Sequence, residues 1–290
     1  MAVKVITDST SYVSRALRKA LDLGVVILSS LLDGVTYSDD ATDYGPFYSA
    51  IAQTRSFPTT SQPAVQDVVD LMEECVRGGD DVVGVFISEK MSGTYSAALL
   101  ARDMVLKRHP HATIEVLDGR SNCMELGFAA IAAARAAAAG GAVAQVVTAA
   151  NDMIDRTRFL FVPDTLEYLR RGGRIGSASA LVGAILRIHP ILTVRDGATD
   201  VYQKVRTRQR AIGNVVGSFA RDLRLKGGLD QVIVHHINDE AAGRELADMI
   251  GEVVGRAVDI CPIGPAIGAH VGPGTVAVVY STCNSMGKGS

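Results

Sequence analysis

The sequence predicts an α/β protein in two parts: an N-terminal parallel-sheet βαβ domain over residues 1–155, and a C-terminal α+β domain with a mixed sheet over residues 156–290. Three observations predict this class. The length of 290 residues suits two domains of roughly 100–200 residues each. Short β-branched runs alternate with helical patterns in the first half. The second half holds Asp196-Gly197 between two β-rich runs, which is a hairpin signal.

In the first half, strand patterns alternate with helical patterns, the order typical of βαβ units around a parallel sheet. Residues 81–87 are almost continuously apolar, as expected for a strand that is buried on both faces. Pro63 lies near the first turn of the next expected helix, where its missing N–H costs nothing. We expect strands at residues 3–6, 24–28, 81–87 and 113–117, and helices at residues 14–21, 44–54, 64–77, 92–108 and 123–139.

The second half combines a hairpin with strands that alternate with helices, which favours an α+β domain. The hairpin strands are expected at residues 188–194 and 201–207, on either side of the Asp-Gly turn. Further strands are expected at residues 158–162, 231–235, 257–261 and 275–280, and helices at residues 165–171, 208–226 and 239–254.

Composition excludes several classes of protein. Hydrophobic residues make up 48% of the chain and charged residues 21%, which is typical of a folded protein. The formal charge of -2 shows no basic excess, and aromatic residues are only 5%, so no nucleic acid is expected as a partner. The Ala-rich stretch 128–150 contains Arg135 and is divided by Gly140-Gly141, so we expect two helices and no stable membrane insertion.

Motifs for metals, nucleotides and cofactors are absent from the sequence. The four cysteines are too far apart for a C-x-x-C pair, and the six histidines show no H-E-x-x-H spacing. The chain has neither a phosphate-binding G-x-x-x-x-G-K-[ST] loop nor a G-x-G-x-x-G fingerprint. We therefore expect no metal and no cofactor. Few cysteines and the lack of an apolar leader predict a cytoplasmic protein.

Three segments place small hydroxyl residues between the end of a strand or loop and a helix. Ligands of parallel sheets bind beyond the carboxyl ends of the strands, and helix N-termini attract anions through their free N–H groups. Hydroxyls beside such groups can bind a carboxylate or a phosphate without a fixed positive charge. Ordinary N-capping of helices is the alternative interpretation. The segments are Asp8-Ser9-Thr10-Ser11, Thr59-Thr60-Ser61-Gln62-Pro63 and Met91-Ser92-Gly93-Thr94-Tyr95-Ser96.

Two further segments are candidates for contact with an anion. Arg170, Arg171 and Arg174 flank Gly172-Gly173. They either hold an anion by charge-assisted hydrogen bonds or stabilise a helix end before its glycine cap. His270 lies between glycines and before a Pro-Gly turn, so we expect it in tight, exposed backbone.

Together, these segments resemble the DegV family of bacterial fatty-acid-binding proteins, which includes the binding subunit of fatty acid kinase. The matching pieces follow the family's order over nearly the whole chain. Each piece alone is a weak signal, but the ordered set is specific. The pieces are Ile6-Thr7-Asp8-Ser9-Thr10, Asp33-Gly34 with Tyr37 and Asp39, Thr60-Ser61-Gln62-Pro63, Ile87-Ser88 with Ser92-Gly93-Thr94-Tyr95, Tyr168-Leu169 with Gly172-Gly173-Arg174-Ile175, Pro190-Ile191-Leu192 with Asp196-Gly197, and His270-Val271-Gly272-Pro273-Gly274.

The resemblance implies that a long-chain fatty acid lies in an inter-domain apolar tunnel. It also implies that Thr60, Ser92 and His270 hydrogen-bond the fatty acid carboxylate. The residues that would support this polar network are Ser9, Ser61, Gly93 and Thr94.

The resemblance further implies a binding subunit and not an enzyme. A separate ATP-dependent kinase would form the acyl phosphate, and Arg174 and Arg206 would present the head group or dock that kinase. Two alternatives remain open. One is an acyl hydrolase with Ser92 as nucleophile and His270 as base. The other is a sensor of small anions that has no acyl tunnel.

Overall fold

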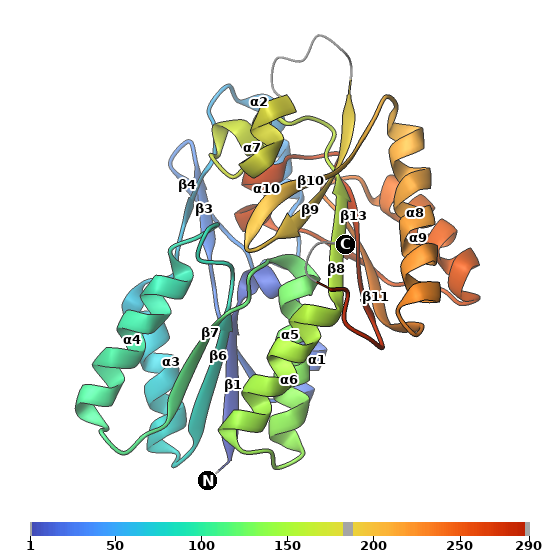
Figure 1. Ribbon diagram of the computed structural model, residues 1–290. Coiled ribbons are helices and arrows are strands. Elements are labelled where there is room, and N and C mark those ends of the chain that lie inside the picture. The colour runs from blue at the N-terminus through green and yellow to red at the C-terminus, as the bar shows by residue number, and fades with distance from the viewer. Residues whose placement is uncertain (1, 182–187, 288–290) are drawn as a thin grey trace. The chain divides into compact units, whose positions relative to one another are not determined.

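The computed structural model describes residues 2–181 and 188–287 and confirms the predicted α/β class (Figure 1). Contacts divide the chain into two compact units. The first unit contains Met1–Ser29, Ser38–Asp40 and Thr60–Ile154, and the second contains Ser30–Tyr37, Ala41–Thr59 and Asp155–Ser290. The second unit therefore includes most of residues 30–59, a stretch that was expected in the N-terminal domain.

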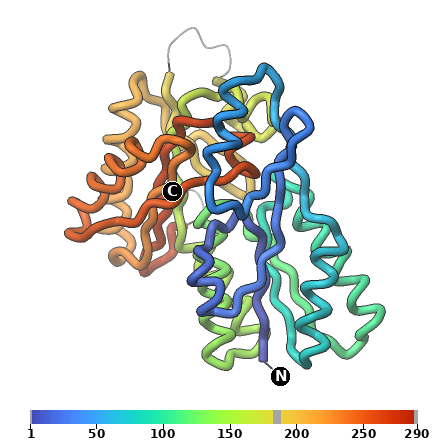
Figure 2. The backbone as a smooth tube through the Cα atoms, turned by 180° about the vertical axis from the view of Figure 1, so that it is seen from behind, coloured from blue at the N-terminus to red at the C-terminus, as the bar shows by residue number. Residues whose placement is uncertain are grey.

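The first unit is a four-stranded parallel sheet in the order β2-β1-β6-β7. Its helices cover both faces, with α3 and α4 on one side and α5 on the other (Figure 1). Seen from behind, β1 runs through the middle of this unit as the dark blue N-terminal segment (Figure 2). The elements are β1 (Val3–Asp8), β2 (Leu23–Val26), β6 (Asp81–Phe86), β7 (Ile114–Asp118), α1 (Arg15–Ala20), α3 (Val65–Arg77), α4 (Thr94–Arg108), α5 (Cys123–Ala138) and α6 (Val143–Arg156).

The core of the first unit follows from the periodicity of its sequence. In α3, Val68, Val69 and Met72 recur on one face and are fully buried against the sheet. The sheet contributes Ile6 and Phe86, which are also fully buried. A continuous apolar run is therefore sandwiched between two helical layers, as the sequence predicts for a parallel sheet.

The second unit is a six-stranded mixed sheet in the order β10-β9-β8-β13-β11-β12. The pair β11–β12 is parallel, and the other four pairs are antiparallel. The strands are β8 (Thr157–Val162), β9 (His189–Arg195), β10 (Ala198–Val205), β11 (Leu229–His236), β12 (Ile260–Pro262) and β13 (Val276–Thr282). The helices are α2 (Gly45–Gln53), α7 (Glu167–Arg171), α8 (Arg208–Leu225), α9 (Glu240–Val254) and α10 (Pro265–Val271).

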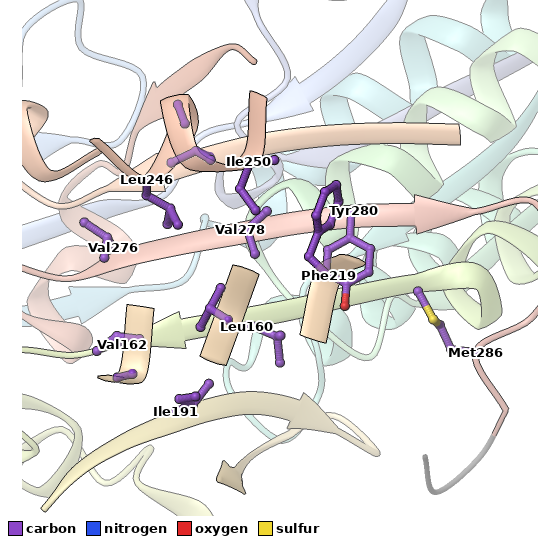
Figure 3. Close-up of a cluster of buried hydrophobic side chains, with 14 residues drawn as sticks. Leu160, Val162, Ile191, Phe219, Leu246, Ile250, Val276, Val278, Tyr280 and Met286 are labelled. Carbon is purple, nitrogen blue, oxygen red and sulfur yellow. The ribbon is translucent and has the colours of Figure 1, made fainter. Parts of the chain in front are cut away.

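Helices α8 and α9 pack on this sheet and form one hydrophobic core with it (Figure 3). Phe219 of α8 packs edge-on against Tyr280 of β13, with ring centroids 5.0 Å apart. Leu160 of β8 belongs to the same cluster and is fully buried. Polar caps determine where both helices begin, because Thr207 accepts the Arg210 N–H and Asp239 accepts the Ala242 N–H.

Two Asp-Gly turns form hairpins. Asp196 and Gly197 have φ values of 50° and 80° and join β9 to β10, which confirms the predicted hairpin. Asp33 and Gly34 have the same conformation, with φ values of 48° and 80°. They join β3 (Ser29–Leu32) to β4 (Val35–Ser38), two strands that were not predicted. With β5 (Thr59–Ser61), these strands form a small sheet in the order β4-β3-β5.

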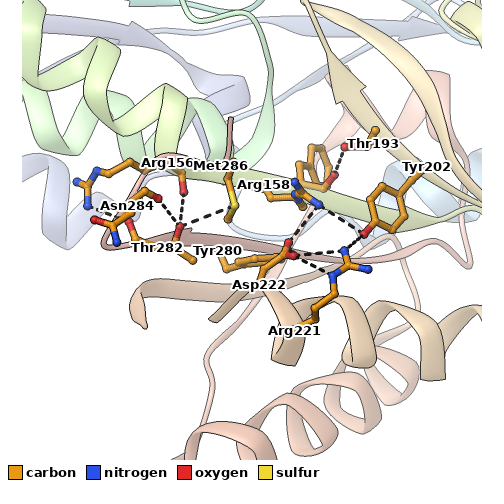
Figure 4. Close-up of polar contacts among 11 residues, drawn as sticks. Arg156, Arg158, Thr193, Tyr202, Arg221, Asp222, Tyr280, Thr282, Asn284 and Met286 are labelled. Carbon is orange, nitrogen blue, oxygen red and sulfur yellow. Dashed lines mark hydrogen bonds and ion pairs between the residues drawn. The ribbon is translucent and has the colours of Figure 1, made fainter. Parts of the chain in front are cut away.

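A buried ion pair lies beside the core of the second unit (Figure 4). The Arg158 guanidinium is 3.1 Å from the Asp222 carboxylate, and the two side chains are only 7% and 6% exposed. Tyr280 donates its hydroxyl proton to the same carboxylate at 2.8 Å. Arg221 extends the network toward Tyr202, at 2.7 Å.

Candidate functional site

Two of the predicted carboxylate-binding residues, Thr60 and Ser92, lie in the first unit. Thr60 is in β5, and Ser92 is in the loop between β6 and α4; both are partly buried. Gln62 brings these segments together. Its side-chain amide packs so closely on Gly93 that a Cβ there would collide with Gln62 Oε1. The two hydroxyl segments therefore meet through Gln62 and Gly93, with one segment in a strand of the small sheet and the other in the loop after β6.

The Ser92 hydroxyl lies at the N-terminus of α4. Its Oγ is 2.9 Å from Thr94 Oγ1 and accepts the Thr94 N–H at 3.3 Å. The N-cap of this 15-residue helix is Gly93, which offers no side chain, and the first turn holds no acidic residue. Free N–H groups and the positive end of the helix dipole are thus combined with a hydroxyl, an arrangement that suits an anion.

Ordinary capping explains only part of this pattern. Ser92 forms a cap-like bond to Thr94, but the N-cap of α3 is Ala64, so Thr60 and Ser61 do not cap that helix. Among the supporting residues, Ser9 is fully buried and its hydroxyl accepts the Leu28 N–H at 3.0 Å. This hydrogen bond links the residue that follows β1 to the backbone just after β2.

His270 lies in the second unit, in the last turn of α10. The expectation of tight, exposed backbone is wrong, because Pro265 begins a helix here and Gly272 ends it. The side chain is partly buried and rests on Gly172, where a Cβ would collide with His270 Nδ1. Burial lowers the pKa of His270 to about 4, and the positive charge of Arg174 adds to this effect. The imidazole is therefore neutral at pH 7.

The arginines beside Gly172 have contacts within the second unit. Arg170 pairs with Glu167 at 2.8 Å, and the Arg171 guanidinium lies 4.7 Å from the centre of the Phe57 ring. Arg174 donates to the Gly172 carbonyl at 2.6 Å, a contact typical of a helix C-terminus. Arg206 is exposed just after β10.

Two pockets lie within single units. One, of about 430 Å³, is in the second unit and is lined by Tyr48, His236 and Arg244 among others. The other, of about 350 Å³, is in the first unit beside Arg108 and His109. Thr60, Ser92 and His270 line neither pocket.

The family model described as "Uncharacterised protein, DegV family" matches residues 2–282. The chain belongs to the DegV family. A DegV domain-containing protein of Clostridium acetobutylicum is 45% identical over 286 residues, which covers 99% of this chain and 100% of that protein. Protein DegV of Bacillus subtilis is 27% identical, with 97% of this chain and 99% of that protein covered.

Solved DegV structures share the fold. The crystal structure of DegV from Bacillus subtilis, described as a fatty acid binding protein, matches with a TM-score of 0.83 at 27% identity and covers 97% of this chain and 99% of that one. A DegV family protein from Thermus thermophilus, whose structure is described by its fatty acid binding, matches with a TM-score of 0.83 at 26% identity. It covers 97% of this chain and 100% of that one. Both of these DegV relatives are thus described by fatty acid binding.

Within residues 2–181 and 188–287, no helix is long and apolar enough to cross a membrane. The same described residues contain no group of three or more His, Cys, Asp or Glu side chains that is placed to hold a metal ion.

Two residues that contact the surroundings of the candidate site residues were not predicted in these roles. Gly172 has no side chain, which leaves space for the His270 imidazole. The side chain of Gln62, two residues after Thr60, packs on Gly93. The only signal for Gly172 is its place in the Gly-Gly turn, which helix capping alone also explains. No pattern in the sequence reveals that the Gln62 amide lies on Gly93, because that contact depends on how two loops meet.

Proposed function

We propose that this DegV protein binds a long-chain fatty acid in an enclosed apolar tunnel and presents the carboxylate to a separate kinase. The observation that carries the proposal is the open N-terminus of α4, where the hydroxyls of Ser92 and Thr94 meet the segment of Thr60. Family membership and the fatty acid binding of DegV relatives support the choice of ligand.

The acyl chain contributes most of the affinity. A chain of about 16 carbons has about 14 methylene groups, and burial at about 0.8 kcal/mol each contributes about 11 kcal/mol before the costs of association. Each hydrogen bond to the charged head adds about 1.5–3 kcal/mol. The tail therefore determines affinity, and the polar residues determine which end of the ligand is held and where.

In this proposal, Thr60, Ser92 and His270 donate hydrogen bonds to the carboxylate. Because the pKa of His270 is lowered to about 4, its imidazole takes part as a neutral donor. Ser61, Gly93 and Thr94 keep the hydroxyls in place. A carboxylate buried without such donors would be strongly disfavoured.

The kinase would transfer the γ-phosphoryl group of ATP to a carboxylate oxygen, forming an acyl phosphate and ADP. Arg174 and Arg206 are both exposed and carry positive charge, so they suit contact with the phosphorylated head group or with the kinase surface. Within the first unit, the Ser92 hydroxyl contacts Thr94, which is not a base, so these contacts lend the hydrolase alternative no support.

The test of binding uses Ser92→Ala combined with Thr60→Ala, with co-purified lipid measured by mass spectrometry. We expect the double variant to lose most of its fatty acid while its thermal unfolding stays close to that of the parent. The matched control is Ser96→Ala with Thr59→Ala, since these neighbouring hydroxyl residues are exposed. Unchanged lipid in the first variant would refute the carboxylate assignment.

The test of the kinase step incubates the loaded protein with ATP and traps acyl phosphate as a hydroxamate. The chain alone should give none, and addition of a bacterial fatty acid kinase should give a signal that falls when Arg174 and Arg206 are both changed to Ala. Product from the chain alone would show that it is itself the enzyme.

A further inference from the structure

Asp8 is a fully buried carboxylate that the proposed function does not use. It ends β1, one of the two inner strands of the parallel sheet, and both of its oxygens accept hydrogen bonds. Oδ1 accepts the Thr10 N–H at 3.0 Å and also the Thr10 hydroxyl. Oδ2 accepts the Ile87 N–H at 2.7 Å. Asp8 therefore ties the end of β1 to the first residue after β6.

The hydrogen bond between Ile87 and Asp8 lies at the start of a short turn that leads to Ser92. The carbonyl of Ser88, the next residue, accepts both the Met91 N–H at 3.0 Å and the Ser92 N–H at 3.1 Å. The Ser88 N–H donates to the Ser121 carbonyl at 3.0 Å. The short turn from Ile87 to Ser92 is thus fixed at its start by Asp8 and closes on the backbone of Ser92.

We propose that Asp8 is a positioning residue for fatty acid recognition: its carboxylate fixes the turn from Ile87 to Ser92, and so holds the Ser92 hydroxyl where it can bind the ligand carboxylate. This inference rests on the proposed function and deepens it, because Asp8 acts on the ligand only through Ser92.

Both oxygens of Asp8 must be acceptors, and an amide cannot replace them. In an Asn of the same shape, the side-chain NH₂ would face a backbone N–H, of Thr10 in one orientation or of Ile87 in the other. Burial raises the pKa of Asp8 to about 6 despite these three donors. Burying this carboxylate among neutral donors costs free energy. We therefore infer that Asp8 serves to fix the backbone geometry more than to stabilise the fold.

The sharpest test is Asp8→Asn, measured as the ratio of the affinity for palmitate to the affinity for methyl palmitate by titration of delipidated protein. Both ligands have the same tail, and only palmitate has a charged head. We expect the ratio to fall about tenfold, the effect of about one hydrogen bond to a charged group. A purely structural role for Asp8 would weaken both ligands together and leave the ratio unchanged.

Two further variants make the test specific. Asp222→Asn changes a buried carboxylate of the second unit and should leave the ratio as in the parent. In a Ser92→Ala background, Asp8→Asn should lower the ratio no further, because the effect passes through Ser92. If the two substitutions lower the ratio additively, Asp8 does not act through Ser92 and the inference is overturned.

The outcomes separate this inference from the proposed function. A parent protein that binds neither ligand, or that does not prefer palmitate, would overturn the proposed function. A parent that prefers palmitate while Asp8→Asn keeps the full preference would overturn the inference alone. If Asp8→Asn does not fold, Thr10→Val removes one of the three donors and should lower the ratio about threefold. An unchanged ratio in that variant would also overturn the inference.

Discussion

Asp8 in the first unit and Asp222 in the second are both buried, but they contact different kinds of partner. Among the described residues, the hydrogen-bond donors to Asp8 are uncharged: the Thr10 N–H and hydroxyl and the Ile87 N–H. Asp222 is paired with the Arg158 guanidinium and also accepts the Tyr280 hydroxyl. The first unit thus contains a carboxylate held by neutral donors, which is also how the proposed site would hold a fatty acid.

The largest effect is expected at the ion pair. Asp222→Ala would remove the carboxylate that faces the buried Arg158 guanidinium, so we expect a loss of about 3–5 kcal/mol in the free energy of unfolding, measured with urea. Arg158→Met with Asp222→Leu removes both charges and should recover much of that loss. A loss below about 1 kcal/mol for the single variant would show that the pair is not the main constraint in this unit.

Acid should affect the two units in opposite directions. Burial raises the pKa of Asp8 to about 6, so its contribution to stability is full below its ordinary pKa of 3.8 and is lost as the pH rises through 6. Burial lowers the pKa of His235 to about 4, so its contribution is full above 6.5 and is lost as the pH falls through 4.

Between about pH 6.5 and about pH 4.5, these shifts should stabilise the first unit and destabilise the second by about 2 kcal/mol each. Hydrogen exchange of amides in β1 and β13, corrected for intrinsic rates, measures both changes in one sample. Asp8→Asn and His235→Asn should each flatten the response of their own unit. Changes in stability of equal size and the same sign in both units would contradict the predicted difference between Asp8 and His235.

The two hydroxyl donors offer a matched pair of smaller changes. Thr10→Val removes a donor from a carboxylate that has no cation, whereas Tyr280→Phe removes one from a carboxylate that keeps Arg158. We expect losses of about 2 and about 1 kcal/mol in the free energy of unfolding, respectively. A larger loss for Tyr280→Phe would show that Arg158 does not substitute for the missing hydroxyl.

The smallest change is expected at the rim of the ion-pair network. Arg221 is half exposed and lies 3.3 Å from Asp222, so Arg221→Met should cost less than about 1 kcal/mol. Its effect should shrink further at high salt, since exposed ion pairs are screened. A loss as large as that of Asp222→Ala would mean that Arg221, and not Arg158, neutralises the buried carboxylate.

Local patterns were enough to predict the fold class and most elements. Asp196-Gly197 predicted a hairpin, and both residues adopt positive φ in the structure. The helices predicted to begin at residues 14, 208 and 239 begin at or next to these positions, beside the capping side chains of Ser14, Thr207 and Asp239. The same Asp-Gly signal at residues 33–34 was used only as part of a family resemblance, so β3 and β4 were not predicted.

Long-range contacts account for what local patterns missed. Residues 41–59 belong to the second unit, where the Tyr48 hydroxyl donates to the Ile263 carbonyl at 2.7 Å across 215 residues of sequence. In the candidate site, the hydroxyl segments of Thr60 and Ser92 were recognisable by residue type. The burial of His270 was not, because the glycines and the Pro-Gly turn around it were interpreted as a loop, whereas His270 lies in the last turn of a helix that begins at Pro265.

The neutrality of His270 has a consequence for how such a carrier would respond to its surroundings. The three groups proposed to hydrogen-bond the acid are two alcohols and an uncharged imidazole, so these hydrogen bonds involve no opposite charge that dissolved ions could screen. Retention of the cargo would then hardly vary with the ionic composition of the medium. Its release would depend on movement of the protein, and not on competition from phosphate or chloride.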